Sequence, residues 1–232
     1  MFSKTIKIFT DPKGYVSYSE EEIKNCFSFF PKNLPSYFNS LPKNIFNTTY
    51  NTFLKNEHTI KTCPGFINFH KKSILFLSPF DIQLIFDQEK IIYALVGNNN
   101  KVIDSIIHHH AQDQFLTYIP SSKYKLIIKI NFHINIFSDV SILLHNPWYH
   151  INSLDIAPGI LPNKWNNQLN IFIAIPKDQK ELIIKQRDCL FMMTPITEKK
   201  IKLKFYEKSL YTPFSKTFSF AKKFFTENIK KK

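Results

Sequence analysis

Apolar and polar residues alternate most clearly between residues 125 and 137, where isoleucine or phenylalanine occupies every second position from Ile128 onward. The intervening positions carry Lys129, Asn131, His133 and Asn135. Because successive side chains of a β-strand point to opposite faces, this pattern predicts a strand with one buried and one polar face. Shorter apolar segments bounded by turn residues are also predicted to be strands: residues 73–77, 82–86, 91–96, 140–144, 169–175, 181–185, 189–194 and 201–206.

The spacing of these strands predicts the fold class. No amphipathic segment of helical length separates them between residues 73 and 206, whereas parallel βαβ units need such helices. We therefore expect a mainly β protein, an antiparallel sandwich or jelly-roll-like barrel with short flanking helices. The expected parts are an N-terminal segment with a short helix and an irregular wrap (1–60), a β core (61–206) and a basic amphipathic C-terminal helix (207–232).

Helices are expected only outside the run of strands. Ser19 and Glu22 have the spacing of a capping box, in which each side chain satisfies a backbone donor of the other residue, so a helix is predicted over 20–28. A helical turn or two is predicted over 64–72. The prolines between residues 31 and 42 favour irregular chain over the surface.

The C-terminal segment combines helical periodicity with most of the net charge. Residues 199–232 hold 11 lysines and 2 glutamates, whereas the whole chain has a net charge of +13. Apolar residues recur at helical spacing at Phe214, Phe218, Ala221, Phe225 and Ile229. Such a segment can bind nucleic acid or another polyanion, bind an anionic membrane, contact a second subunit, or dock its apolar stripe on the body of the protein. The candidate polyanion-binding residues are Lys216, Lys222, Lys223, Lys230, Lys231 and Lys232.

Composition weakens the general argument from charge. Every basic residue except Arg187 is lysine, and the abundance of Lys, Asn, Ile, Phe and Tyr is typical of an A and T rich genome. Arginine supplies the bidentate contacts to phosphate and guanine, so a lysine-rich chain indicates a more diffuse positive field.

Cysteine usage and hydropathy indicate the compartment. The 3 cysteines are far apart and form no Cys-x-x-Cys pair, which argues against a disulfide framework or a thiolate zinc site. No apolar run is long enough to span a membrane or to form a signal-peptide core. We therefore expect a soluble protein in a reducing compartment such as the cytoplasm.

Histidines are the first candidates for chemistry, because imidazole binds divalent transition metals. A cupin-like site needs a His-x-His pair, an acidic ligand and a further histidine, but the glutamate expected after the pair is missing here. The alternative is that these are ordinary loop and strand residues. The candidate metal ligands are His108, His110, His133, His145 and His150.

The segment from residue 146 to 166 is a second candidate, because it is predicted to be a long ordered loop that holds both tryptophans. Aromatic rings provide contact area in ligand pockets and polar groups fix orientation. The alternative is a loop that only caps one end of the sandwich. The candidate pocket residues are Trp148, Tyr149, His150, Asp155 and Trp165.

Several short motifs in order resemble an uncharacterised family of β-rich proteins from tailed phages, notably marine ones, and some bacteria. They are residues 62–66 (TCPGF), 78–81 (SPFD), 146–149 (NPWY), 157–160 (APGI) and 184–189 (IKQRDC). The resemblance covers about residues 60–197. The chain departs from the family where an Asp-rich turn is expected (161–164) and where a Gly-Thr-Pro turn is expected (187–189). The family implies a phage or marine bacterial origin and supplies no established activity. With that origin, the expected location is the cytoplasm of a bacterium or an infected host cell, with association with the virion as an alternative.

The function that these patterns favour is a non-enzymatic binding or assembly module of phage type, forming a homo-oligomer or part of a virion. The chain has no Gly-x-Ser-x-Gly elbow, phosphate-binding loop or dinucleotide fingerprint. Two alternatives stay open: a metal-dependent cupin-like enzyme that uses the histidines, and a nucleic-acid-binding protein that acts through its C-terminal tail.

Overall fold

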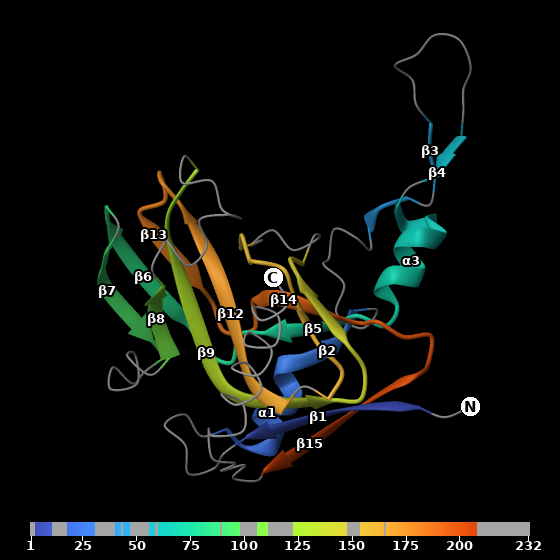
Figure 1. Cartoon of the computed structure of the whole chain (residues 1–232). Helices are drawn as coiled ribbons and strands as arrows, with labels where there is room; N and C mark the ends of the chain where they lie inside the picture. The colour runs from blue at the N-terminus through green and yellow to red at the C-terminus, as the bar shows by residue number, and fades with distance from the viewer. Residues whose placement is uncertain are drawn as a thin grey trace, which may run out of the picture.

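The computed structural model describes residues 3–10, 18–30, 40–42, 44–46, 56–58, 60–88, 90–97, 106–110, 123–147, 154–164 and 166–207. Within these ranges the protein is mainly β, as predicted, and its strands form antiparallel sheets packed as in a sandwich (Figure 1). The predicted C-terminal helix and all of the candidate polyanion-binding lysines lie outside the described residues.

The first sheet contains the longest strands and includes the N-terminal strand. Its strand order is β12–β9–β1–β15, and β8 pairs with β9. The bounds are β1 Lys4–Thr10, β8 Ile107–His110, β9 Tyr124–Ser138, β12 Asn166–Pro176 and β15 Ile201–Glu207. All pairs are antiparallel except β1–β15, which is parallel. Parallel strands that follow one another in the sequence need a crossover connection, usually a helix. Strands β1 and β15 are the first and last described strands, so the rest of the chain makes this connection.

Two inner strands of the second sheet are buried on both of their faces. Its order is β11–β10–β14–β5–β2, and its bounds are β2 Phe27–Phe29, β5 Ile74–Leu77, β10 Ile142–His145, β11 Gly159–Leu161 and β14 Cys189–Pro195. All residues of β5 and β14 are buried. One face meets the first sheet through Phe76 and Phe132, whose rings are 4.9 Å apart. The other face forms a smaller cluster around Phe30, Leu75 and Met192, against which Phe66 packs.

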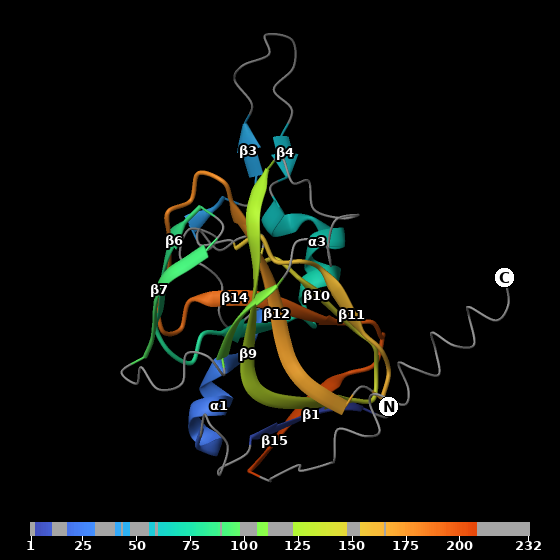
Figure 2. The same cartoon turned by 60° about the vertical axis from the view of Figure 1, so that its left-hand side comes forward.

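Two smaller sheets complete the described strands. A three-stranded sheet has the order β13–β6–β7, with bounds β6 Ile82–Asp87, β7 Lys90–Val96 and β13 Glu181–Ile184. A hairpin of β3 (Asn44–Phe46) and β4 (Asn56–His58) projects away from the other sheets (Figures 1 and 2).

The helices begin where the sequence predicts. Helix α1 (Glu20–Cys26) has the full capping box: Glu22 N donates to Ser19 Oγ at 3.2 Å, and Ser19 N donates to Glu22 Oε2 at 2.7 Å. The helix ends two residues before the predicted end, because Phe27 already pairs with β5 as the start of β2. Helix α3 (Pro64–His70) follows the 3-10 turn η2 (Ile60–Thr62) and confirms the helical turns expected there.

Strand β9 bends, and this bend connects two parts of the molecule (Figures 1 and 2). Residues 127–130 of β9 pair with β8, whereas residues 134–138 pair with β1. Between these parts, His133 has a positive φ of 54°, and the register with β12 shifts between Gln168 and Asn170. An extra residue in one strand of an antiparallel pair kinks it and increases its twist, which explains the change of direction.

The strands predicted from alternation are all present, each within three residues of its expected bounds. The strands that the sequence patterns missed are β1, β2, β3, β4, β8 and β11. Residues 159–161, predicted to be loop, form β11 because their backbone pairs with β10. Strands β1 and β2 belong to the predicted N-terminal segment and pair with strands of the core. The irregular segment expected between residues 31 and 42 lies mostly outside the described residues.

Candidate functional site

The outer face of the first sheet carries lysines and aromatic rings on adjacent strands. In β1, burial alternates so that Ile6 and Ile8 face the core, while Lys7 and Phe9 lie on the outer side. The parallel register places Lys7 beside Lys204 and Phe9 beside Tyr206. Lys202, Lys204 and Tyr206 are exposed at alternate positions of β15.

The aromatic rings of this face contact one another and one of the lysines. The Phe9 and Tyr206 rings are stacked, with centroids 5.1 Å apart and planes 20° from parallel. Phe137 of β9 lies opposite Lys7, whose Nζ is 5.4 Å from the centre of the Phe137 ring. We call the set Lys7, Phe9, Phe137, Lys202, Lys204 and Tyr206 the basic face.

Among the described residues, the strands that form the basic face carry few acidic side chains. Strands β1, β9 and β12 contain no Asp or Glu, and β15 contains only Glu207. The Oε1 atom of Glu207 accepts a hydrogen bond of 2.6 Å from the backbone N of Glu20. Among the described residues, Lys7, Lys202 and Lys204 form no ion pair. Their charges therefore add to one positive field over half-buried rings, a combination that attracts polyanions with flat bases.

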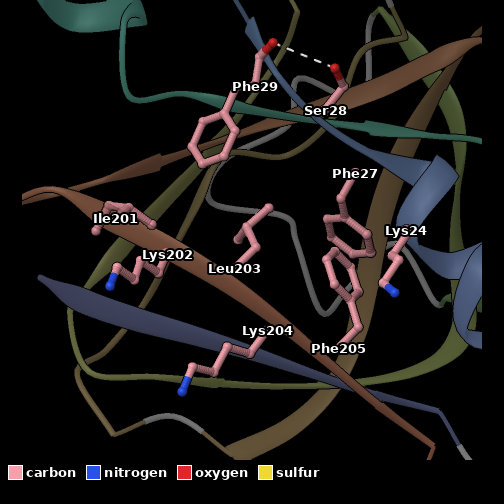
Figure 3. A pocket seen from close by; sticks show the side chains of 9 residues that line it. All are labelled: Lys24, Phe27, Ser28, Phe29, Ile201, Lys202, Leu203, Lys204 and Phe205. Carbon is pink, nitrogen blue, oxygen red and sulfur yellow. Dashed lines mark hydrogen bonds between the residues drawn. The ribbon is translucent and has the colours of Figure 1, made fainter.

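A shallow, open groove of about 430 Å³ lies beside β15, on its core-facing side. Phe27 and Phe29 of β2 face Leu203 and Phe205 of β15 across it, and Lys24 of α1 stands at one end (Figure 3). The side chains of Lys202 and Lys204 point to the opposite side of β15 (Figure 3). We call this feature the edge groove, because β2 and β15 are each the last strand of their sheet.

The structure separates most of the predicted metal ligands. His108 lies on β8 opposite Lys129, His133 lies at the bend of β9, and His145 lies on β10 in the other large sheet. The side chain of His110 and all of His150 lie outside the described residues. Among the described residues, no group of three or more His, Cys, Asp or Glu side chains could hold a metal ion. The predicted metal site thus stays a prediction that depends on residues such as His150.

His145 instead joins a buried hydrogen-bond chain. Its Nε2 is 2.8 Å from Thr194 Oγ1, its Nδ1 is 2.9 Å from the carbonyl oxygen of Asn146, and Thr194 Oγ1 is 2.7 Å from Ser73 Oγ. Because a carbonyl oxygen only accepts, Nδ1 carries the proton in the neutral ring and Nε2 accepts from Thr194. Burial lowers the pKa of His145, although the Asn146 carbonyl acts in the opposite direction. This hydrogen-bond chain links β10, β14 and Ser73, the residue before β5.

His70, which the sequence patterns did not single out, lies close to His145. Their ring centroids are 6.2 Å apart, and His70 is 3% exposed. Burial, with a smaller contribution from His145, lowers the pKa of His70 from 6.5 to about 4. Its position at the end of α3 depends on how that helix packs on the second sheet, which no local pattern reveals.

Of the predicted ligand pocket, only Asp155 is described. Its Oδ2 accepts a hydrogen bond of 2.7 Å from Tyr124 Oη and lies 3.7 Å from Lys123 Nζ. The pKa of Lys123 is raised, first by its side-chain contact with Tyr124 and then by the charge of Asp155. Trp148, Tyr149, His150 and Trp165 lie outside the described residues, so the pocket stays a prediction.

No described helix is long and apolar enough to cross a membrane. No protein-family model, curated protein or solved structure matches the chain. The resemblance to the phage family therefore stays a prediction.

Proposed function

We propose that this protein is a non-enzymatic binding module whose ligand is single-stranded nucleic acid, held on the basic face. The observation that carries the proposal is that Lys7, Lys202 and Lys204 lie on one face with the stacked rings of Phe9 and Tyr206, and that no carboxylate of the described residues forms an ion pair with these lysines. Lysines attract the phosphates, and aromatic rings stack on bases of any sequence. In duplex DNA the faces of the bases are stacked on one another, so they are less accessible to these aromatic rings.

The C-terminal lysines extend the same charge along the chain. Strand β15 is followed directly by residues 208–232, which contain seven lysines and one glutamate. We propose that the basic face positions the strand and that these lysines add nonspecific contacts to phosphates. A phage origin and assembly with further copies or a virion are compatible with this proposal and remain predictions, as does the cupin-like metal enzyme.

The test is the salt dependence of binding to a fluorescent oligothymidylate of about 16 nucleotides, near the upper site size of a small binding domain. Each phosphate contact with a single strand contributes about −0.7 to the slope of log affinity against log salt. Combining Lys202→Ala with Lys204→Ala should therefore flatten the slope by about 1.4. The matched control combines Lys177→Ala with Lys180→Ala in the exposed turn between β12 and β13, and should leave the slope unchanged.

Two further variants separate the basic face from simpler explanations. Tyr206→Ala should weaken oligothymidylate binding about ten-fold through lost stacking, and should leave heparin binding unchanged. Truncation after Thr212 should weaken binding without abolishing it. If truncation abolishes binding while the Lys202 and Lys204 variant binds like the wild type, the tail alone is the binding site and the basic face is not.

A further inference from the structure

Among the described residues, the outer edge of β15 has backbone groups without a hydrogen-bond partner, beside the edge groove. Lys4 N donates to Lys200 O at 2.8 Å, and Lys4 is the register partner of Ile201. In a parallel pair of strands, a residue forms backbone hydrogen bonds with the two residues that flank its register partner. Lys4 therefore bonds to the residues on either side of Ile201, and the even-numbered residues of β15 point their N–H and C=O groups toward β1. Those of Ile201, Leu203 and Phe205 point away from β1. Within the described chain, no strand pairs with this side of β15.

The groove beside this edge has an apolar floor and one closed end. Leu203 and Phe205 of β15 and Phe29 of β2 are partly buried against the core. At the α1 end, the Phe27 and Phe205 rings are 6.0 Å apart, and Glu20 N donates to Glu207. The open length from Ile201 to Phe205 fits a strand of about five residues, or about 16 Å at 3.3 Å per residue.

We infer that the edge groove binds an extended peptide segment of a partner protein, added as a strand to β15, in which acidic and apolar residues alternate. Strand addition satisfies the free N–H and C=O groups, while alternate side chains of the peptide determine specificity. Residues of the added strand that face the core lie over Leu203 and Phe205. Those on the other side lie beside Lys202 and Lys204, where opposite charges stabilise a cross-strand pair.

Charge disfavours two occupants that this chain could provide, β15 of a second copy and residues 208–232. Pairing β15 with β15 of a second copy would place lysines beside lysines, which disfavours edge-to-edge association. Residues 208–232 are equally lysine-rich. None of the described strands carries acidic residues at two successive positions of one face. A partner with an acidic, alternating segment fits both the lysines and the groove.

The first test uses the wild-type protein and short labelled peptides, measured by fluorescence anisotropy. An acetylated heptapeptide that alternates glutamate and valine should bind. A lysine–valine peptide and a peptide of the same composition with its glutamates clustered should bind at least about five-fold more weakly, the equivalent of about one net hydrogen bond or charge pair. Two further peptides are N-methylated, one at its odd-numbered and one at its even-numbered residues. Because only one of these two sets of N–H groups faces β15, one peptide should lose binding and the other should bind as before. Equal binding of the alternating and clustered peptides, or equal binding of the two N-methylated peptides, would overturn strand addition.

Two variants test the protein side and separate this site from nucleic-acid binding. Combining Lys202→Glu with Lys204→Glu should reverse the preference to the lysine–valine peptide, whereas Lys177→Glu with Lys180→Glu should not. Leu203→Pro removes an N–H from the free edge and leaves the bonds to β1 in place, so it should abolish peptide binding while oligothymidylate binding persists. Peptide binding that survives Leu203→Pro with unchanged affinity contradicts the inference. If the wild type binds the peptide but not oligothymidylate, only the proposed function fails.

Discussion

Acidification should destabilise this protein through His70, because aromatic rings surround its imidazole. The ring centroids of Phe30, Phe66 and Phe69 lie 4.9, 4.3 and 4.9 Å from that of His70, and His145 lies at 6.2 Å. A protonated imidazole loses its hydration in this environment, and a second histidine disfavours an added charge. The pKa of His70 is accordingly lowered to about 4 in the folded protein.

The direction and size of the effect follow from linkage. The unfolded chain binds the proton near the ordinary pKa of about 6.5, and the folded chain does so only near pH 4. Stability from this group is therefore complete above pH 6.5 and is lost as the pH falls toward 4. Between about pH 7.5 and 5, His70 alone should lower the free energy of unfolding by about 2 kcal/mol. The pKa of His145 is lowered too, so its contribution has the same sign.

The measurement is urea denaturation of wild type and His70→Phe at several pH values in this range. Phenylalanine keeps an aromatic ring in the cluster and removes the titrating group. The wild type should lose about 2 kcal/mol more than the variant, or about 4–8 °C in melting temperature for a chain of this size. His108→Asn, which removes a partly exposed imidazole on β8, is the matched control and should follow the wild type. If His70→Phe loses stability as steeply as the wild type, His70 is not the responsible group.

Three further predictions concern backbone conformation, capping and thiol reactivity. His133 has a positive φ, so His133→Gly should be tolerated, whereas His133→Val should cost about 1–3 kcal/mol in urea denaturation; equal stabilities would contradict the strain. Ser19→Ala removes the capping box and should lower the free energy of unfolding by about 1 kcal/mol, with a matching loss of helical circular dichroism. Cys63 is exposed and should react quickly with Ellman's reagent. Cys26 and Cys189, which are buried and whose pKa values burial raises, should react only on unfolding; rapid labelling of all three would contradict their burial.

The local patterns that predicted the strands are those in which burial of one face dominates. Strand β9 alternates over most of its length and was recognised, and the capping residues of α1 mark its start because they act within one turn. The sequence pattern predicts the end of a helix where β2 begins, since three residues carry too little periodicity to oppose a neighbouring helical pattern. Strand β1 does alternate through Ile6 and Ile8, so a signal for it was present in the sequence.

For the candidate sites too, the sequence identifies some residues, whereas the proximity of others depends on the tertiary fold. The lysines of β15 belong to the basic segment that composition identified, but nothing local shows that Lys7 and Phe9 lie beside them. Their proximity depends on a parallel pair between the first and last described strands. His133 is a predicted ligand because it stands on a polar face, and its position at the bend of β9, with a positive φ, is not visible in the alternation.

The sequence by itself determined the mainly β class, most strand positions and the start of α1, because these depend on side-chain alternation and on hydrogen bonds between near neighbours. It also determined where the positive charge concentrates. Tertiary structure alone decided which strands become edges and which histidines are buried together. It alone placed lysines from the two ends of the described chain on one face. These properties depend on contacts between residues far apart in sequence, whose pairing is selected by the packing of the whole core.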